Sequence, residues 1–302
     1  MSLQNFFLSR LLKSRQRASM KLSPQARFSQ ARKFLARDFS RISPSISVRP
    51  DQIAGVKVEW VAPKALALDA RSPICLYLHG GAFVMGSPNS HRDMAAQLAQ
   101  KAGVRMLMVD YRLAPEHPYP AAHEDVMTVY RALLAQGVPA QRLFIAGDSA
   151  GGNLALAAAQ SIRDAELPAP RGLVLFSPWL DLTQQSASIT SRAAKDVMLN
   201  RQLLDEVVPM YAPGLPAHDP RISPLFGNLA GLPPCLTVVS QSEILLDDAL
   251  QLHQKLQAAG GDSRCLQWAH TPHAFVVMAR LLPEARDALD QTAQFMVRLA
   301  PS

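Results

Sequence analysis

Long apolar runs and paired cysteines are both missing from this 302-residue sequence. No apolar stretch reaches the roughly 18 residues that a membrane-spanning helix needs. The few cysteines lie far apart, which fits neither a disulfide framework nor a zinc motif, so we predict no metal site. We expect buried free thiols, typical of a reducing cytoplasmic compartment, at Cys75, Cys235 and Cys265.

Acidic residues are scarce at the start of the chain. Residues 1–49 carry eleven Lys or Arg and a single acid, Asp38, so the net charge of this segment is +10. The whole chain has a net charge of +7, which leaves the remainder at −3 and close to neutral. A nucleic-acid-binding protein usually spreads its basic charge over a folded face. Because the charge here belongs to one arm, we predict no nucleic-acid partner.

This basic N-terminal arm, residues 1–49, opens with a candidate helix. Its apolar stripe is expected to consist of Phe6, Phe7, Leu8, Leu11 and Leu12. A cap helix lying on the body is the favoured interpretation. A basic amphipathic helix that touches anionic membrane and a targeting presequence stay open as alternatives. A secretory signal peptide is disfavoured, since Arg10 interrupts the apolar run and no A-x-A cleavage site follows.

After residue 50, short apolar runs alternate with helical patterns. Strands are expected over 56–61, 74–78, 106–109, 143–146, 173–176, 236–239 and 265–268. Helices are expected over 92–101, 121–135, 153–163, 246–258 and 284–299. This alternation predicts an α/β fold, with a mostly parallel sheet covered by helices on both faces, as one domain over 50–302.

One connection is longer than this pattern requires. About 55 residues separate the strand near Leu173 from the strand near Leu236, whereas a crossover helix needs far fewer. The excess, residues 182–216, contains a helical stretch over 202–210. We therefore predict a helical cap insertion over one end of the sheet, which would cover a site there together with the N-terminal arm.

The segment Gly147-Asp148-Ser149-Ala150-Gly151 fits the pattern G-x-S-x-G. An apolar strand ends just before it and an alanine-rich helix follows, which is the setting of a nucleophile elbow. Small residues leave room for the sharp turn that exposes the serine hydroxyl. Ser149 is therefore a candidate nucleophile, and the alternative is a plain N-cap serine.

A serine nucleophile needs a base and oxyanion donors, and the chain offers both. The loop after the strand at 74–78 begins His79-Gly80-Gly81-Ala82, whose N–H groups could bind an oxyanion together with that of Ala150. A simple tight turn is the alternative. For the base, His273 follows the last expected strand in the required chain order, and His270 is its close rival.

Five segments resemble blocks of the bacterial hormone-sensitive-lipase-like esterases, a family of α/β hydrolases: YLHGGAFVMGS, VDYRLAPEHPYPAAHEDV, GDSAGGN, SPWLDLT and DPRISPL. The resemblance covers residues 75–295. It implies oxyanion donors at Gly80, Gly81 or Ala82 together with Ala150, and it supports His273, whose H-A-F resembles the family's H-G-F. Ala82 stands where the family has a third glycine, which matters only if a positive φ is needed.

The acid of the predicted triad departs from the family's D-P-L-x-D motif. Glu243 stands at the position of the first Asp, in the sequence SEILLDD, and Asp247 stands at the position of the second. We favour Glu243, because a glutamate orients a histidine as an aspartate does, and Asp247 stays open. We also expect His79, Phe83 and Asp148 to bind substrate, although loop positioning and a structural role are equally open for Asp148.

Together these residues predict a carboxylic ester hydrolase that acts on small-molecule esters through an acyl-enzyme, without a cofactor. The resemblance implies short to medium acyl chains. Three alternatives stay open: a lactone hydrolase or amidase on the same triad, a related acyl-transfer enzyme, and a non-catalytic small-molecule-binding protein of the same fold. Members of the family often pair through an edge strand, so a homodimer is one assembly that the resemblance allows.

Overall fold

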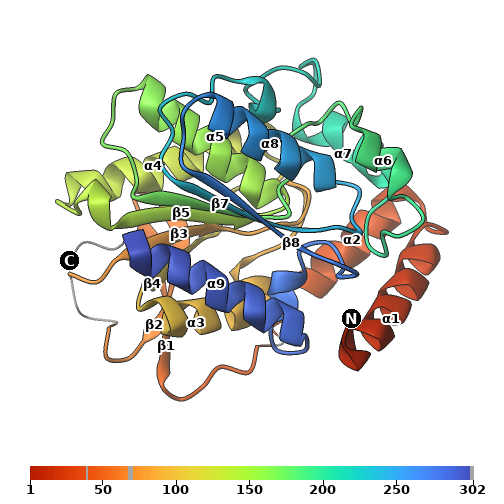
Figure 1. Ribbon diagram of the computed structural model, residues 1–302, viewed down its shortest axis with the longest axis horizontal. Helices are drawn as coiled ribbons and strands as arrows, with labels where there is room; N and C mark the ends of the chain where they lie inside the picture. Colours follow the sequence, from red (N-terminus) through yellow and green to blue (C-terminus); the bar gives the residue numbers. More distant parts are fainter. Residues whose placement is uncertain (39, 67–70, 300–302) are drawn as a thin grey trace.

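A computed structural model describes residues 1–38, 40–66 and 71–299. Within these residues the centre is an eight-stranded sheet in the order β1-β2-β4-β3-β5-β6-β7-β8 (Figure 1). Its strands are β1 (Ile46–Ile53), β2 (Val56–Pro63), β3 (Ile74–Leu78), β4 (Arg105–Val109), β5 (Leu143–Asp148), β6 (Gly172–Phe176), β7 (Cys235–Ser240) and β8 (Ser263–Trp268). From β4 to β8 all neighbours are parallel, which confirms the predicted α/β hydrolase fold.

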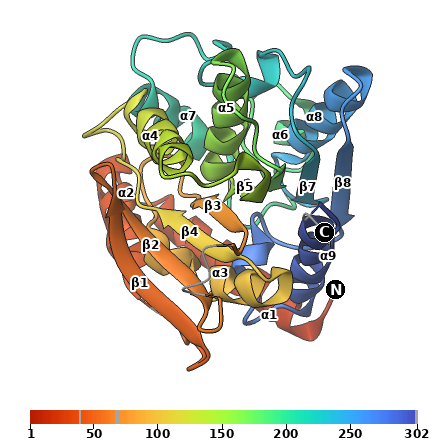
Figure 2. The ribbon, with the colours of Figure 1, turned by 90° about the vertical axis from the view of Figure 1, so that its left-hand side faces the viewer.

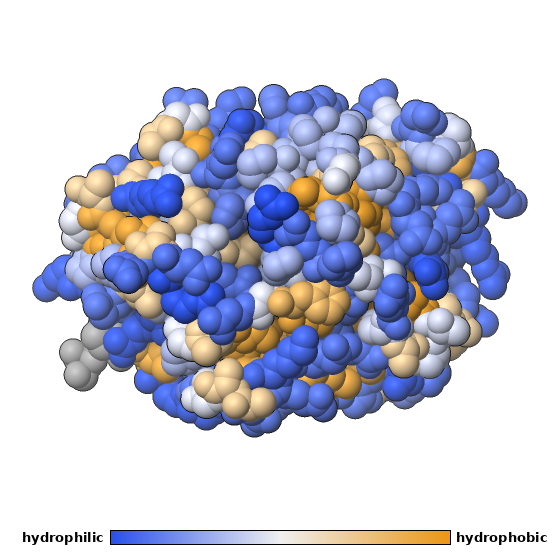
Figure 3. All heavy atoms as spheres, turned by 90° about the horizontal axis from the view of Figure 1, so that it is seen from above, coloured by the Kyte–Doolittle hydropathy of each residue, from blue (hydrophilic) through white to orange (hydrophobic). Residues whose placement is uncertain are grey.

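Helices cover both faces of the sheet (Figures 1 and 2). One face carries α4 (Ala121–Ala135), α5 (Ala150–Asp164) and α8 (Leu246–Ala258). The other carries α3 (Pro88–Ala102) and α9 (Pro283–Leu299), which pack against each other. Seen from above, over the first group of helices, apolar side chains appear only as patches broken up by hydrophilic residues (Figure 3).

The buried strands alternate their side chains between two cores. In β3, Leu76 packs with the core beneath α4, α5 and α8, whereas Cys75 and Tyr77 pack with the core beneath α3 and α9. Every residue of β3, β5, β6 and β7 is buried. Continuous apolar runs are therefore the pattern that these strands show, as expected for a parallel sheet between two helical layers.

Strand β1 was not expected from the sequence. It carries Arg49, Pro50 and Asp51, and it pairs antiparallel with β2 at the edge of the sheet. Proline and charged residues are tolerated at an edge, where one side of the strand needs no partner. Because β1 begins at Ile46, the predicted boundary between residues 49 and 50 falls inside a strand.

The N-terminal arm and the insertion each form two helices. These are α1 (Leu3–Ser19), α2 (Pro24–Leu35), α6 (Ala187–Ser191) and α7 (Arg201–Tyr211). Arg27 on α2 forms an ion pair with Glu206 on α7, so the two segments contact each other. Arg32 on α2 donates to the carbonyl oxygen of Val84, in the loop that follows β3.

Most of the apolar stripe of α1 faces away from the body, although Leu8 packs against the core beneath α3 and α9. Phe6, Phe7 and Leu11 are exposed, whereas Leu8 and Leu12 are half-buried. Two cysteines are buried as expected, but Cys265 is only half-buried because it lies on β8, whose outer edge has no partner strand among the described residues. No helix in the described ranges is long and apolar enough to cross a bilayer.

Candidate active site

A sharp turn between β5 and α5 holds Ser149. This residue has φ 53° and ψ −119°, a left-handed conformation that a non-glycine residue adopts only under strain. A Cβ atom on Gly147 would collide with the carbonyl oxygen of Gly151, and one on Gly151 would collide with the carbonyl oxygen of Leu78. The small residues of the motif are therefore required by the close approach of β3, β5 and α5.

The structure brings Ser149, His273 and Glu243 into one chain of hydrogen bonds. His273 Nε2 lies 2.9 Å from Ser149 Oγ, and His273 Nδ1 lies 3.3 Å from Glu243 Oε1. Glu243 follows β7 and His273 follows β8, so all three side chains meet at the carboxyl ends of parallel strands. All three residues are buried.

The charges around His273 raise the pKa of its imidazole. Burial alone would lower the pKa of its imidazole, but the carboxylates of Glu243, Asp196 and Asp148, with Glu243 contributing most, together outweigh burial and raise the pKa above its usual value. A carboxylate accepts hydrogen bonds, so Nδ1 carries the proton that faces Glu243. Nε2 is then free to accept the proton of Ser149 Oγ.

Ser177 is a site residue that the sequence analysis did not identify. Its hydroxyl donates to Glu243 Oε2 at 2.7 Å and accepts the N–H of Ala274 at 3.1 Å. It therefore ties the acid to the residue after the histidine. Its position directly after a buried strand, at the edge where the other site residues lie, is the signal that could have revealed it.

Asp247 and His270, the alternative candidates for the acid and the base, lie outside this chain of hydrogen bonds. Asp247 Oδ2 accepts the N–H of Ser188 at 2.7 Å, so it fixes α6 to the start of α8. His270 is exposed, and its carbonyl oxygen accepts a hydrogen bond from the side chain of Asn5. Neither side chain takes part in the chain of hydrogen bonds that ends at Ser149.

The loop after β3 presents N–H groups near the elbow. Gly81 and Ala82 have φ values of 125° and 54°, so Ala82 does adopt the positive φ that an alanine tolerates less well than a glycine. A Cβ atom on Gly81 would collide with the carbonyl oxygen of Met85. Within the described ranges, the N–H groups of Gly81, Ala82 and Ala150 have no acceptor.

Gly80 and Asp148 differ from their predicted roles. The N–H of Gly80 donates to Asp148 Oδ1 at 2.8 Å, which contradicts the prediction of Gly80 as an oxyanion donor. The same oxygen accepts from the hydroxyl of Tyr77 at 2.7 Å and lies 3.1 Å from His91 Nε2. Asp148 is buried and its carboxylate binds the loop, so it is placed to position Gly80 rather than to bind substrate.

Charge stabilises this arrangement. Burial would raise the pKa of Asp148, but His91 and the other donors outweigh burial and lower it. For His91, burial would lower the pKa, and the Asp148 carboxylate raises it instead. Each of the two residues therefore favours the charged form of the other beside the loop.

The two other predicted substrate-binding residues are packed inside the protein. His79 is buried and stacks on Tyr111 at 4.3 Å between ring centroids. Burial, with His91 nearby, lowers the pKa of His79 to about 4, so this side chain is neutral. Phe83 stacks on Tyr211 of α7 at 3.7 Å, which joins the loop after β3 to the insertion.

Asp148→Asn is expected to lower kcat for ester hydrolysis by about tenfold to a hundredfold and to leave KM nearly unchanged. The neutral amide lacks the negative charge that attracts His91, so the anchor of the loop weakens, and oxyanion donors act mainly in the transition state. Steady-state kinetics on a p-nitrophenyl ester measure the split. Asp125→Asn is the control, because Asp125 is a buried carboxylate that binds Arg112 instead. Equal kcat for wild type and Asp148→Asn would contradict this positioning role.

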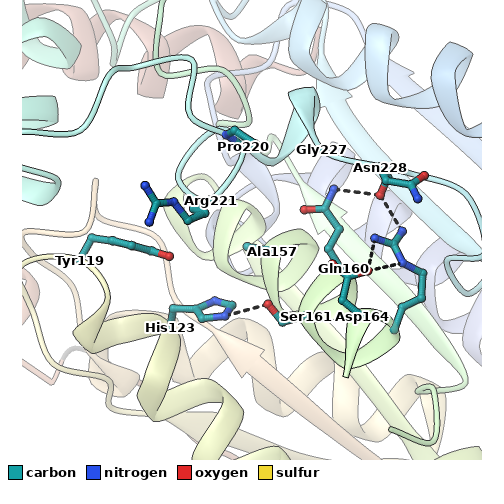
Figure 4. Close-up of a pocket in the computed structure, with 11 residues that line it drawn as sticks. Tyr119, His123, Ala157, Gln160, Ser161, Asp164, Pro220, Arg221, Gly227 and Asn228 are labelled. Atoms are coloured by element: carbon teal, nitrogen blue, oxygen red, sulfur yellow. Dashed lines mark hydrogen bonds and ion pairs between the residues drawn. The ribbon is translucent and has the colours of Figure 1, made fainter. Parts of the chain in front are cut away.

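A recess of about 290 Å³ on the outer side of α5 is separate from this arrangement (Figure 4). His123 and Ser161 point toward each other on one side of it, and Gln160 reaches Asn228 on the other. Ala157, on its floor, is two helical turns along α5 from Ser149, roughly 12 Å away at 1.5 Å per residue. No group of His, Cys, Asp or Glu in the described residues could hold a metal ion.

Comparisons with known proteins identify the family of this chain. A family described as having the α/β hydrolase fold matches residues 75–277, which include Ser149, Glu243 and His273. An acetyl-hydrolase of Streptomyces hygroscopicus is 40% identical over 83% of this chain and 84% of its own length. An esterase of Acinetobacter venetianus is 38% identical over 85% of this chain and 84% of its own.

A solved structure decides the branch of that family. It is an esterase of the bacterial hormone-sensitive lipase family, with a TM-score of 0.90, 33% identity, and coverage of 100% of this chain and 99% of the other. The chain belongs to this family. It is a carboxylic ester hydrolase of the serine esterase class, as predicted. The esterase relatives of this hormone-sensitive-lipase-type enzyme act on small-molecule esters.

Proposed function

We propose that this esterase hydrolyses esters of short carboxylic acids through an acyl-enzyme on Ser149. The observation that carries the proposal is the continuous chain of hydrogen bonds from Ser149 Oγ through His273 to Glu243. A serine hydroxyl is a weak nucleophile, and an adjacent oriented base is what activates it.

The proposed reaction has two halves. Ser149 Oγ attacks the ester carbonyl while His273 Nε2 takes its proton, and a tetrahedral intermediate forms. The intermediate collapses when the C–O bond to the alcohol breaks and His273 returns its proton to the leaving oxygen. In the second half, His273 takes a proton from water, the water attacks the acyl carbon, and Ser149 Oγ leaves with that proton.

We assign oxyanion stabilisation to the N–H groups of Gly81, Ala82 and Ala150. These donors have no other acceptor within the described ranges, and Ala150 also lies at the N-terminus of α5, where the helix dipole favours negative charge. One such donor contributes about 3 kcal/mol to the transition state.

Two observations support a short acyl chain. The stacked rings of Phe83 and Tyr211 join the loop after β3 to the insertion, and we infer that this packing limits the space beside the elbow. The relative from Streptomyces hygroscopicus is named for acetyl hydrolysis. We propose that acetyl to butyryl esters fit this space and that longer chains do not.

A panel of p-nitrophenyl esters from acetate to palmitate tests the proposal. The highest kcat/KM is expected at acetate to butyrate, with a loss of about tenfold or more by decanoate, since a chain that cannot enter loses its binding energy in the transition state. Tyr211→Ala should move the optimum to longer chains, and Phe226→Ala, an exposed aromatic away from the insertion, should not. A preference of the wild type for palmitate would contradict the proposed acyl size.

A further inference from the structure

Helix α1 is attached to the body through Leu8, which packs against the core, and through hydrogen bonds from polar side chains. Asn5 Nδ2 donates to the carbonyl oxygen of His270 at 3.0 Å, and Gln16 Nε2 donates to that of Leu199 at 2.8 Å. Lys13 Nζ donates to the carbonyl oxygen of Ala194 at 3.1 Å. These contacts make α1 part of the folded protein.

The opposite face of α1 leaves large apolar side chains in water. Leu3, Phe7 and Leu11 are 76%, 67% and 50% exposed, and they follow the spacing i, i+4 and i+8 along one side of the helix. Phe6, beside them, is 38% exposed. Single exposed apolar residues are ordinary, but several gathered on one helix face mark an interaction surface.

Basic side chains flank this apolar row. Arg10, Arg15, Arg17 and Lys21 are all exposed, and residues 1–37 contain no Asp or Glu. We define the outer face as the exposed apolar and basic residues of α1 together with Lys21, just past its end: Leu3, Phe6, Phe7, Arg10, Leu11, Arg15, Arg17 and Lys21. A second copy of the chain would bring two cationic faces together, so charge disfavours self-association there. An anionic surface with an apolar interior complements both properties.

We propose that the outer face of α1 docks the enzyme on an anionic lipid surface, with Phe7 and Leu11 inserted at the boundary between headgroups and acyl chains and the arginines on the headgroups. The helix would lie in the plane of the lipid surface while its polar side stays bound to the protein. This surface is independent of the proposed catalytic function, because lipid binding needs no turnover.

Helix α1 lies beside the insertion (Figure 1), so docking through α1 would also bring the insertion close to the lipid surface. The helix touches the segment between α6 and α7 at Ala194 and Leu199, and it touches the loop before His273. A recess of about 350 Å³ lies between α1, that segment and the loops that lead to Glu243 and His273. A docked enzyme would therefore hold its insertion beside the lipid surface, where apolar esters collect.

Vesicle co-sedimentation of the full chain tests the proposal. We expect binding to vesicles of phosphatidylglycerol and phosphatidylcholine, little binding to phosphatidylcholine alone, and weaker binding as salt rises. F7Q/L11Q should weaken binding by about tenfold or more, because two apolar side chains no longer enter the lipid. R10Q/R17Q/K21Q should weaken binding to the anionic vesicles by about a hundredfold, which corresponds to roughly fivefold per charge.

Matched variants test whether lipid binding requires the outer face or only exposed apolar and basic residues anywhere on the protein. L281Q/V297Q replaces two exposed apolar residues elsewhere, and K57Q/K64Q/R131Q replaces three exposed basic residues elsewhere. Both should bind like the wild type. No sedimentation with anionic vesicles, or equal binding of F7Q/L11Q and wild type, would overturn the proposal. So would light scattering that shows a dimer in the wild type and a monomer in F7Q/L11Q without vesicle binding, since that result assigns the face to a second copy.

Discussion

Ser149→Ala lowers kcat for ester hydrolysis by about a million-fold, the loss typical of a missing serine nucleophile. Without Oγ no acyl-enzyme forms, and only binding and the oxyanion donors remain to assist attack by water. The decrease is measured on p-nitrophenyl acetate after subtraction of the spontaneous rate. The turn itself tolerates alanine, because the change removes one oxygen and leaves the backbone unchanged.

Ser161→Ala is the matched control for this variant. Ser161 lies on the same helix, α5, but its hydroxyl faces His123 at 3.0 Å, outside the chain of hydrogen bonds. Its activity should equal that of the wild type. If Ser149→Ala kept more than about a thousandth of the wild-type kcat, another group would be the nucleophile and the proposed reaction would be wrong.

Glu243→Gln has the second largest expected effect, a loss of about 10⁴-fold in kcat. A glutamine cannot stabilise the imidazolium that forms when His273 takes the serine proton, and its amide group can hold the histidine in the wrong tautomer. Folding should survive, since glutamine matches glutamate in shape and can still accept from Ser177. The loss should appear in kcat for every ester in the panel.

Asp247→Asn is the control for the acid. Its carboxylate accepts a backbone N–H of α6, so the variant should change stability slightly and kcat by less than about threefold, as expected for a partly exposed hydrogen bond. If Asp247→Asn lost activity and Glu243→Gln kept it, Asp247 would be the acid of the triad and the assignment to Glu243 would be wrong.

Much of the fold follows from local patterns. Strands such as β3 and β7 are buried on both faces, so their apolar runs stand out from the sequence. Strand β1 does not, because an edge strand with Pro50 and alternating polar residues looks like a loop. The apolar periodicity of the sequence also did not predict which side of α1 faces the body. Its apolar residues suggested the buried side, but only Leu8 of the stripe packs against the core, and Asn5 and Gln16 make hydrogen bonds to the body.

The sequence predicts individual site residues better than it predicts which site residues contact each other. The elbow and the chain order single out Ser149 and His273, because the strand-to-helix turn and its small residues are local. Contacts between elements that are far apart in the chain cannot be read from the sequence alone. Asp148 meets His91, which α3 brings from the other side of the loop, and this pair explains why the N–H of Gly80 is occupied. Ser177 reaches Glu243 only because β6 and β7 are neighbours.

The central claim is that the charge of Glu243 holds His273 as the base for Ser149, and the pH dependence of kcat/KM tests it most directly. His273 must be neutral to act, so activity falls as pH drops through its pKa, which Glu243 raises above the usual 6.5. In Glu243→Gln, burial still lowers the pKa of His273, and only the weaker effects of Asp196 and Asp148 oppose it, so the acidic limb should move to lower pH. We predict this shift in Glu243→Gln and coincident limbs for wild type and Asp247→Asn. An unmoved limb in Glu243→Gln would contradict the account.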